Sequence, residues 1–190
     1  MAHVLNIEEI PFSRFGSFLT ISRLPRDKEN LYFRSVRGGD VGIDLGVIFQ
    51  LVPLGKENEE LEYDVEMRPH ELILSTCEGE IRFCIAEKNV LLIKGTGVSL
   101  GLRRKSSRYD AVFPMSSKIY RVNCSGPDLR YIVSCLQGEI SHHAPWEGDR
   151  SPYIELCLSP GSDGTFYVML EEFTGASRPI QEQRQVCAAW

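Results

Sequence analysis

The stretch 60–67 reads Glu60-Leu61-Glu62-Tyr63-Asp64-Val65-Glu66-Met67, in which acidic and apolar residues alternate without a break. Successive side chains of a β-strand point to opposite faces, so this alternation predicts a strand with one wet face and one buried face. The segments 80–87, 152–158 and 165–170 repeat the pattern, although Tyr167 and Met169 make the second face of the last segment partly apolar. Period two therefore predicts a fold made of half-buried strands.

Other segments are apolar on both faces, and these predict central strands that are covered on two sides: 47–51, 90–93 and 131–136. Further strands are expected at 17–23, 31–36, 71–76, 98–102, 109–113 and 118–123. Glycine, proline and aspartate separate these segments, and such short connections favour antiparallel hairpins over βαβ crossovers. The sequence thus predicts an all-β fold, a large antiparallel β-sandwich of the supersandwich type over residues 1–176.

The C-terminal residues 177–190 are the one segment with a helical pattern. Ser177 is suited to cap a helix and Pro179 to its first turn. The segment has a thin apolar stripe of Ile180, Val186, Cys187 and Trp190. We expect a short helix or a linker that leads to a further domain beyond Trp190, and an exposed apolar face near this tail.

Composition narrows the class of protein. A net charge of −5 argues against nucleic-acid binding, and the basic cluster at 103–108 is short enough to be a solvated turn. The N-terminus lacks the pattern of a secretion signal, and no apolar run reaches the length of a membrane helix. Six cysteines without a C-x-x-C pair predict free thiols in a cytoplasmic protein. Neither a bound metal nor a cofactor is expected.

Gly97-Val98-Ser99-Leu100-Gly101 matches the G-x-S-x-G pattern of serine hydrolases. That chemistry requires a sharp turn between a strand and a helix, but the alternation of Val98, Leu100 and Leu102 places Ser99 on a strand face. A serine hydrolase that uses Ser99 is therefore a remote alternative. Dinucleotide binding at Gly95-Thr96-Gly97 is disfavoured as well, because no helix is predicted to follow.

The segment 137–149 contains His142, His143 and Trp146 and carries three interpretations. It is a long polar loop pinned by Trp146, a contact surface for a sugar or a partner domain, or a metal site. Adjacent residues of a strand diverge, so the two histidines bind one ion only if this segment is an irregular loop.

A second candidate binding cluster consists of Arg34, Arg37 and Asp40. The two arginines are suited to clamp a carboxylate, while pairing with Asp40 or Asp44 at the end of a strand is the commoner arrangement. Glu171 and Glu172 are neighbours on a strand and therefore do not form the facing pair of acids that glycoside hydrolysis uses.

Three segments resemble the opening of bacterial (α/α)6-barrel glycoside hydrolases, the group of mannosylglycerate hydrolase, trehalase and glucoamylase relatives. They are Ile7-Glu8-Glu9-Ile10-Pro11-Phe12-Ser13-Arg14-Phe15-Gly16-Ser17-Phe18, Leu31-Tyr32-Phe33-Arg34-Ser35-Val36-Arg37-Gly38-Gly39-Asp40 and Ile81-Arg82-Phe83-Cys84-Ile85-Ala86-Glu87. The resemblance implies an N-terminal β-sandwich joined to a helical barrel that carries the catalytic carboxylates. It assigns no catalytic residue to this chain.

These observations lead to the expectation of a noncatalytic N-terminal sandwich domain of a carbohydrate-active enzyme. Its partners would be a downstream helical catalytic domain and a saccharide, but neither nucleic acid nor a membrane. A freestanding carbohydrate-binding module is the alternative, with Arg34, Arg37, Asp40, His142, His143 and Trp146 as the candidate binding residues.

Overall fold

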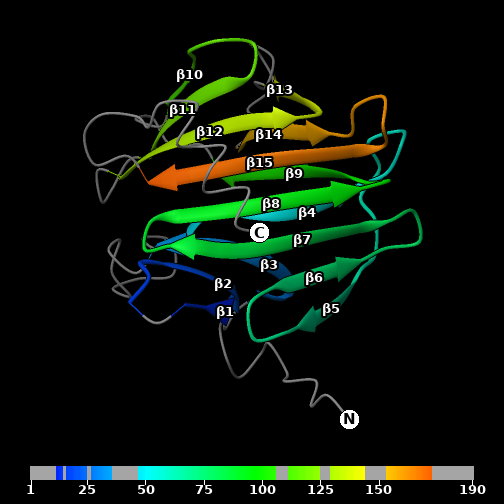
Figure 1. Ribbon diagram of the computed structural model, residues 1–190, viewed down its shortest axis with the longest axis horizontal. Coiled ribbons are helices and arrows are strands. Elements are labelled where there is room, and N and C mark those ends of the chain that lie inside the picture. Colours follow the sequence, from blue (N-terminus) through cyan, green and yellow to red (C-terminus); the bar gives the residue numbers. More distant parts are fainter. Residues whose placement is uncertain are drawn as a thin grey trace.

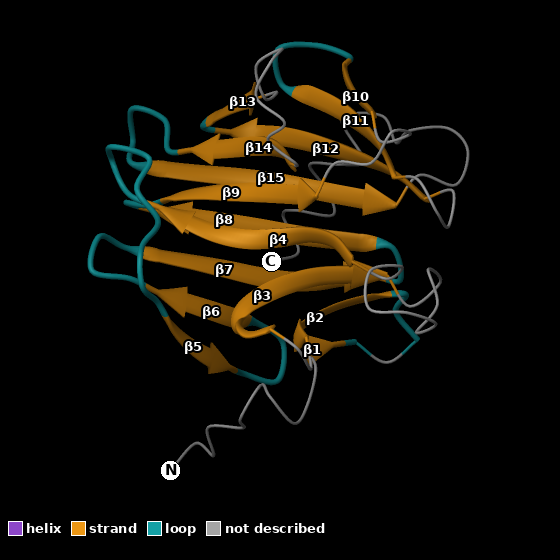
Figure 2. Cartoon of the chain, turned by 180° about the vertical axis from the view of Figure 1, so that it is seen from behind, coloured by secondary structure: helices purple, strands orange, loops and turns teal. Residues whose placement is uncertain are grey.

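The computed structural model describes residues 12–14, 16–24, 27–35, 47–105, 111–124, 129–143 and 153–172. This part of the chain forms fifteen strands and no helix. The strands make two antiparallel sheets of seven and eight strands that lie face to face, as seen from the two sides in Figure 1 and Figure 2. The all-β, two-sheet architecture predicted from the alternating polarity is confirmed.

The spatial order of the strands in each sheet differs from their order along the chain. The seven-stranded sheet consists of β1 (Phe12–Ser13), β2 (Leu19–Leu24), β3 (Asp27–Ser35), β4 (Val47–Leu54), β9 (Ser99–Lys105), β14 (Tyr153–Ser159) and β13 (Glu139–His143). The eight-stranded sheet consists of β10 (Ala111–Pro114), β11 (Ile119–Cys124), β12 (Leu129–Gln137), β15 (Thr165–Glu172), β8 (Val90–Thr96), β7 (Glu80–Glu87), β6 (Leu72–Ser75) and β5 (Asp64–Met67). The chain passes repeatedly between the sheets, so strands distant in sequence become neighbours, such as β8 and β15.

One hydrophobic core fills the space between the sheets. It is built from alternate residues of the inward faces, and it includes Phe33 of β3 and Tyr131 of β12. Their ring centroids lie 5.9 Å apart at an interplanar angle of 79°, which is the edge-to-face geometry that aromatic rings favour. This contact joins the two sheets directly.

The strands expected to be central are interior strands of their sheets, namely β4, β8 and β12. The prediction of a strand over 60–67 is wrong for residues 60–63, because β5 begins only at Asp64. Glu60 forms a single bridge with Leu54, and the amide of Leu61 donates to the carbonyl oxygen of Pro53. Leu61 and Tyr63 still pack against the core, so burial alternates there without a β-ladder.

A second correction concerns the segment 137–149, for which the sequence predicts a loop. Its first part is strand β13, paired with β14 along Glu139–His143. The remainder, including Trp146, lies outside the described residues, as does the helix or linker expected at 177–190.

Two further findings concern cysteines and membrane helices. The cysteines among the described residues are free, and Cys124, Cys135 and Cys157 are buried. Burial raises the pKa of the Cys135 and Cys157 thiols. In the part of the chain that the structure describes, no helical segment has the length and hydropathy to span a bilayer.

Gly95 of β8 has a packing reason to be glycine, and this leads to a stability prediction. A Cβ atom at this position would lie 2.0 Å from Cε1 of Phe166, whose side chain is fully buried in the core. We expect Gly95→Ala to lower the free energy of unfolding by about 1–3 kcal/mol, as overpacking of a core does. Urea unfolding followed by circular dichroism measures the change.

Gly101→Ala is the matched control, because its added Cβ would meet the Glu155 carboxyl group and Leu54 Cδ1 at 3.3 Å. The loss in this control should be smaller. Equal stabilities of the two variants would contradict the packing argument.

Candidate functional site

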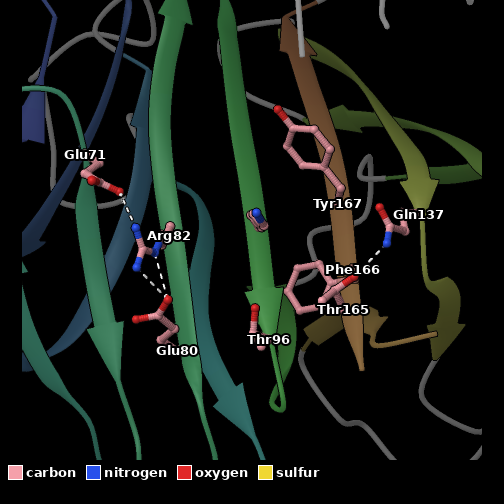
Figure 3. Close-up of a pocket in the computed structure, with 9 residues that line it drawn as sticks. Glu71, Glu80, Arg82, Thr96, Gln137, Thr165, Phe166 and Tyr167 are labelled. Atoms are coloured by element: carbon pink, nitrogen blue, oxygen red, sulfur yellow. Dashed lines mark hydrogen bonds and ion pairs between the residues drawn. The ribbon is translucent and has the colours of Figure 1, made fainter. Parts of the chain in front are cut away.

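A hollow of about 530 Å³ lies on the outer face of the eight-stranded sheet, and we call it the trough. Its volume falls within the range of ligand pockets, although it is open on one side. Figure 3 shows its lining side chains, which come from the edge of β6 and from β7, β8, β15 and β12. The lining residues are Glu71, Glu80, Arg82, Lys94, Thr96, Gln137, Thr165, Phe166 and Tyr167.

Strand register brings the central trough residues into one row. Arg82 of β7 pairs with Lys94 of β8, which pairs with Tyr167 of β15, which pairs with Gln137 of β12. Directly paired residues of an antiparallel sheet project from the same face, so these four side chains stand side by side. Residues 91, 93, 166 and 168, on the alternate positions, belong to the core.

An ion-pair network forms the β6–β7 side of the trough. Arg82 Nη2 lies 2.7 Å from Glu80 Oε1, and Arg82 Nη1 lies 3.5 Å from Glu71 Oε2. Glu71 also faces Arg68, whose guanidinium lies 2.8 Å from Glu66. The hydrogen bonds from Arg68 are the main cause that lowers the pKa of Glu66. These partly exposed pairs fix side-chain positions more than they stabilise the fold.

A hydrogen-bonded turn forms the β12–β15 side. Gln137 Nε2 donates to Thr165 Oγ1 at 2.7 Å and also to a carboxylate oxygen of Asp163. The amide and then the hydroxyl of Thr165 donate to Asp163 and hold the pKa of this carboxyl group below its usual value. Because its amide nitrogen is held in this way, Gln137 has a fixed orientation at the rim.

Lys94 and Tyr167 occupy the middle of the trough. Lys94 is exposed, and among the described residues no ion pair or hydrogen bond engages its ammonium group. Tyr167 is half-buried and packs on its other side against Val90, Leu92 and Met169. The middle of the trough therefore offers an aromatic side chain beside a cation, between two sets of oriented polar groups.

The two histidines predicted as binding residues do not converge. His142 contacts Tyr120 of the opposite sheet, with ring centroids 6.4 Å apart, whereas the exposed His143 lies 3.3 Å from Ser141 Oγ. They belong to a regular strand, so their side chains point to opposite faces. No cluster of three metal-ligating side chains occurs among the described residues.

Arg34 lies on β3 and is half-buried. Strands β4, β9 and β14 separate β3 from β13, which places Arg34 roughly 19 Å from the histidine strand at a spacing of about 4.8 Å per strand. Arg37, Asp40 and Trp146 lie outside the described residues. None of Arg34, His142 and His143 lines the trough.

Ser99 is the first residue of β9, where its Cα pairs with Leu54, and its hydroxyl lies 3.3 Å from that of Ser159. The strand-to-helix turn that a nucleophilic serine requires is therefore not the local geometry. The glycines of the G-x-S-x-G match and of Gly95-Thr96-Gly97 have packing or turn roles instead. Gly97 has φ of +75°, and a Cβ there would lie 2.6 Å from the carbonyl oxygen of Glu78.

The acids at the end of β15 diverge as their adjacency on a strand predicts. Glu172 points into the sandwich, where its carboxylate accepts a hydrogen bond from the Ser35 hydroxyl at 3.3 Å. Burial, and then the nearby Glu172 charge, raises the pKa of Tyr131 well above its usual value. This polar cluster closes one end of the core and is separate from the trough.

Sequence reasoning did not identify the trough residues as a site. The signals were present in the period of 80–87, which puts Glu80 and Arg82 on one face, and in the partly apolar second face of 165–170. What was missing was the pairing of β8 with β15, which are far apart in the chain.

The chain matches no protein-family model, and no curated protein is significantly similar to it in sequence. The functional argument therefore depends on the geometry of the trough and on the segments that resemble glycoside hydrolases.

The position of His142 leads to a prediction about stability and pH. Burial, and to a lesser extent the neighbouring His143, lowers the pKa of His142 below its ordinary value of 6.5. The unfolded chain then binds more protons than the folded chain as the pH falls below about 7, so protonation favours unfolding. We expect the free energy of unfolding to decrease between pH 7.5 and 5.5, as measured by urea titration.

His142→Gln should remove much of this decrease, whereas His143→Gln, on the opposite face of β13, should retain most of it. The same pH dependence in the wild type and in His142→Gln would show that other groups cause the effect. Asp163 and Glu66 also have lowered pKa values, but as carboxyl groups they titrate below this window.

Proposed function

We propose that this chain is a noncatalytic β-sandwich domain of a carbohydrate-active enzyme and that it contacts a saccharide in the trough. The observation that carries this proposal is the row of Arg82, Lys94, Tyr167 and Gln137 across four neighbouring strands. It combines an aromatic side chain with donors and acceptors of hydrogen bonds on a broad, open surface.

Saccharides have the chemistry that this surface would recognise. The C–H face of a sugar ring is apolar and packs on an aromatic ring, while its hydroxyl groups both donate and accept hydrogen bonds. Tyr167 offers the first type of contact. Lys94 beside it and the exposed Thr96 and Gln137 offer the second type. The two glutamates that line the trough, Glu71 and Glu80, are charge-balanced by Arg82 and Lys94, which favours a neutral sugar over a strongly charged one.

The role as an accessory domain is supported by the resemblance to the opening of (α/α)6-barrel glycoside hydrolases. A two-sheet all-β architecture is what that resemblance implies for this part of such an enzyme. The catalytic carboxylates of those enzymes belong to the helical domain, so the sandwich would support that domain and contribute to the binding of the substrate.

Binding in the trough is tested by titrating the ¹⁵N-labelled chain with a panel of neutral mono- and disaccharides. We expect amide shifts at Lys94, Gln137 and Tyr167. Tyr167→Ala should weaken binding about tenfold or more, which corresponds to the loss of about 1.4 kcal/mol of contact energy. Tyr63→Ala is the matched control, because Tyr63 is another partly buried tyrosine that does not line the trough.

The alternative of a freestanding binding module predicts a different pattern in the same titration. The amide signals of Arg34, His142 and His143 would then shift, and those of the trough residues would not. That pattern, or equal weakening by the two tyrosine variants, would reject the trough as the saccharide site.

The noncatalytic role is tested separately by activity. We expect no turnover when the purified chain is incubated with α-linked disaccharides and product release is followed by chromatography, because no catalytic carboxylate is assigned to it. Turnover that survives repeated purification and disappears on unfolding would overturn the accessory role. Labelling of Ser99 by a fluorophosphonate would instead support the hydrolase alternative.

A further inference from the structure

The outer face of the eight-stranded sheet has an apolar half beside the trough. Val90 and Leu92 of β8 and Met169 of β15 form a cluster distinct from the core, with Cys84, Ala86 and Leu136 packed around it. We call this set the outer patch. Its residues alternate along the strands with residues 85, 91 and 170, which face the other sheet, so the outer patch faces away from the sandwich.

The outer patch is buried although it faces outward. Val90, Leu92 and Met169 each have 0% exposed surface. No described strand lies over this face in Figure 1. Described side chains reach only its edge, where Arg14 donates to the carbonyl oxygen of Ile85 and Ser17 to that of Lys88. Neighbouring side chains on a flat sheet do not remove all solvent from a leucine and a methionine, so another segment lies over them.

We propose that the C-terminal segment 173–190 packs across the outer patch and covers it. The inference is independent of whether the trough binds a saccharide. The outer patch lies on central strands of a two-layer fold. Covering its apolar surface with a third element is favourable, because that surface is then removed from water.

Connectivity favours this segment over the others outside the described ranges. Residues 1–11, 36–46 and 144–152 adjoin strands of the seven-stranded sheet in the sequence, and residues 106–110 lead to β10, an edge strand outside the patch. Residues 125–128 join two neighbouring strands and are too few to cross the patch. Residues 173–190 continue directly from β15, a central strand of the patch itself.

The end of β15 is anchored beside the patch. The Glu172 amide donates to the carbonyl oxygen of Asn89, and the Asn89 side chain donates to the carbonyl oxygen of Glu172. Asn89 directly precedes Val90, so the chain leaves the sheet at the border of the patch. The patch extends over β7, β8, β15 and β12, which is three strand spacings or about 14 Å. Eighteen residues span about 27 Å as a helix, which is long enough to cover it.

The sequence of the segment complements the patch. Its stripe of Ile180, Val186, Cys187 and Trp190 is apolar, whereas residues 181–185 are glutamine, glutamate and arginine. An amphipathic segment of this kind is stable only when its apolar side packs on another surface.

Thiol labelling tests the cover in the full chain. Cys84 lies in the outer patch opposite Leu92, while Cys77 is exposed elsewhere on the same sheet's border. The variant Ile180→Asp/Val186→Asp/Trp190→Asp places charges in the stripe. We expect it to speed iodoacetamide labelling of Cys84 several-fold, because this thiol is half-buried and uncovering the patch makes it fully accessible. Labelling of Cys77 should not change, and peptide mass spectrometry measures both rates.

The matched control is Gln181→Asp/Gln183→Asp/Gln185→Asp, which adds the same charge at polar positions and should leave the Cys84 rate unchanged. A second measurement uses Trp146→Phe, in which Trp190 is the single tryptophan. Its fluorescence should be several-fold less quenched by acrylamide than in the urea-unfolded chain, because docking buries the indole.

The proposal is overturned if Cys84 in the unaltered chain reacts as fast as Cys77, or if the two triple variants label Cys84 equally. It is also overturned if protection of Cys84 depends on protein concentration, since a second copy would then be the cover.

Discussion

The shared interior between two stacked sheets is the constraint on which the rest of the structure depends. Each strand contributes every second side chain to this interior, and the contact of Phe33 with Tyr131 shows how directly the sheets meet. Because the inward positions are fixed by this packing, a shift of one residue in any strand would expose its core face. The outward positions are thereby fixed as well, and they carry both the trough and the outer patch.

The fold was predictable because this constraint leaves a strong local signal. Alternation in 80–87 and apolar runs such as 90–93 correspond to β7 and β8. The errors occur where the pattern of burial does not coincide with strand pairing. At 60–63, Leu61 and Tyr63 are partly buried against the core while the backbone leaves the ladder, so the alternation is real but the strand is absent. At 139–143, the polar composition of the segment suggested a loop, yet His142 packs on Tyr120 within a regular strand.

The site was less predictable, since it depends on strand order. Arg34 and the histidine pair were selected as local clusters of chemically capable residues, but three strands of the sheet lie between them. Lys94 and Tyr167 are 73 positions apart in the chain and face each other only because β15 returns to pair with β8. Lys94 does not stand out within its own segment, and Tyr167 stands out only as an apolar residue on the second face of its strand. Side-chain chemistry can be read locally, but which side chains meet is decided by long-range pairing.

The trough and the outer patch are two ends of one surface, and Tyr167 belongs to both. Along β8, Lys94 lines the trough and Leu92 lies in the patch, while along β15 the corresponding residues are Tyr167 and Met169. The change from polar to apolar thus occurs over one two-residue step of the pleat on both strands. Whatever fixes the Tyr167 ring on its patch side also fixes the face that it presents to the trough, because one side chain makes both contacts.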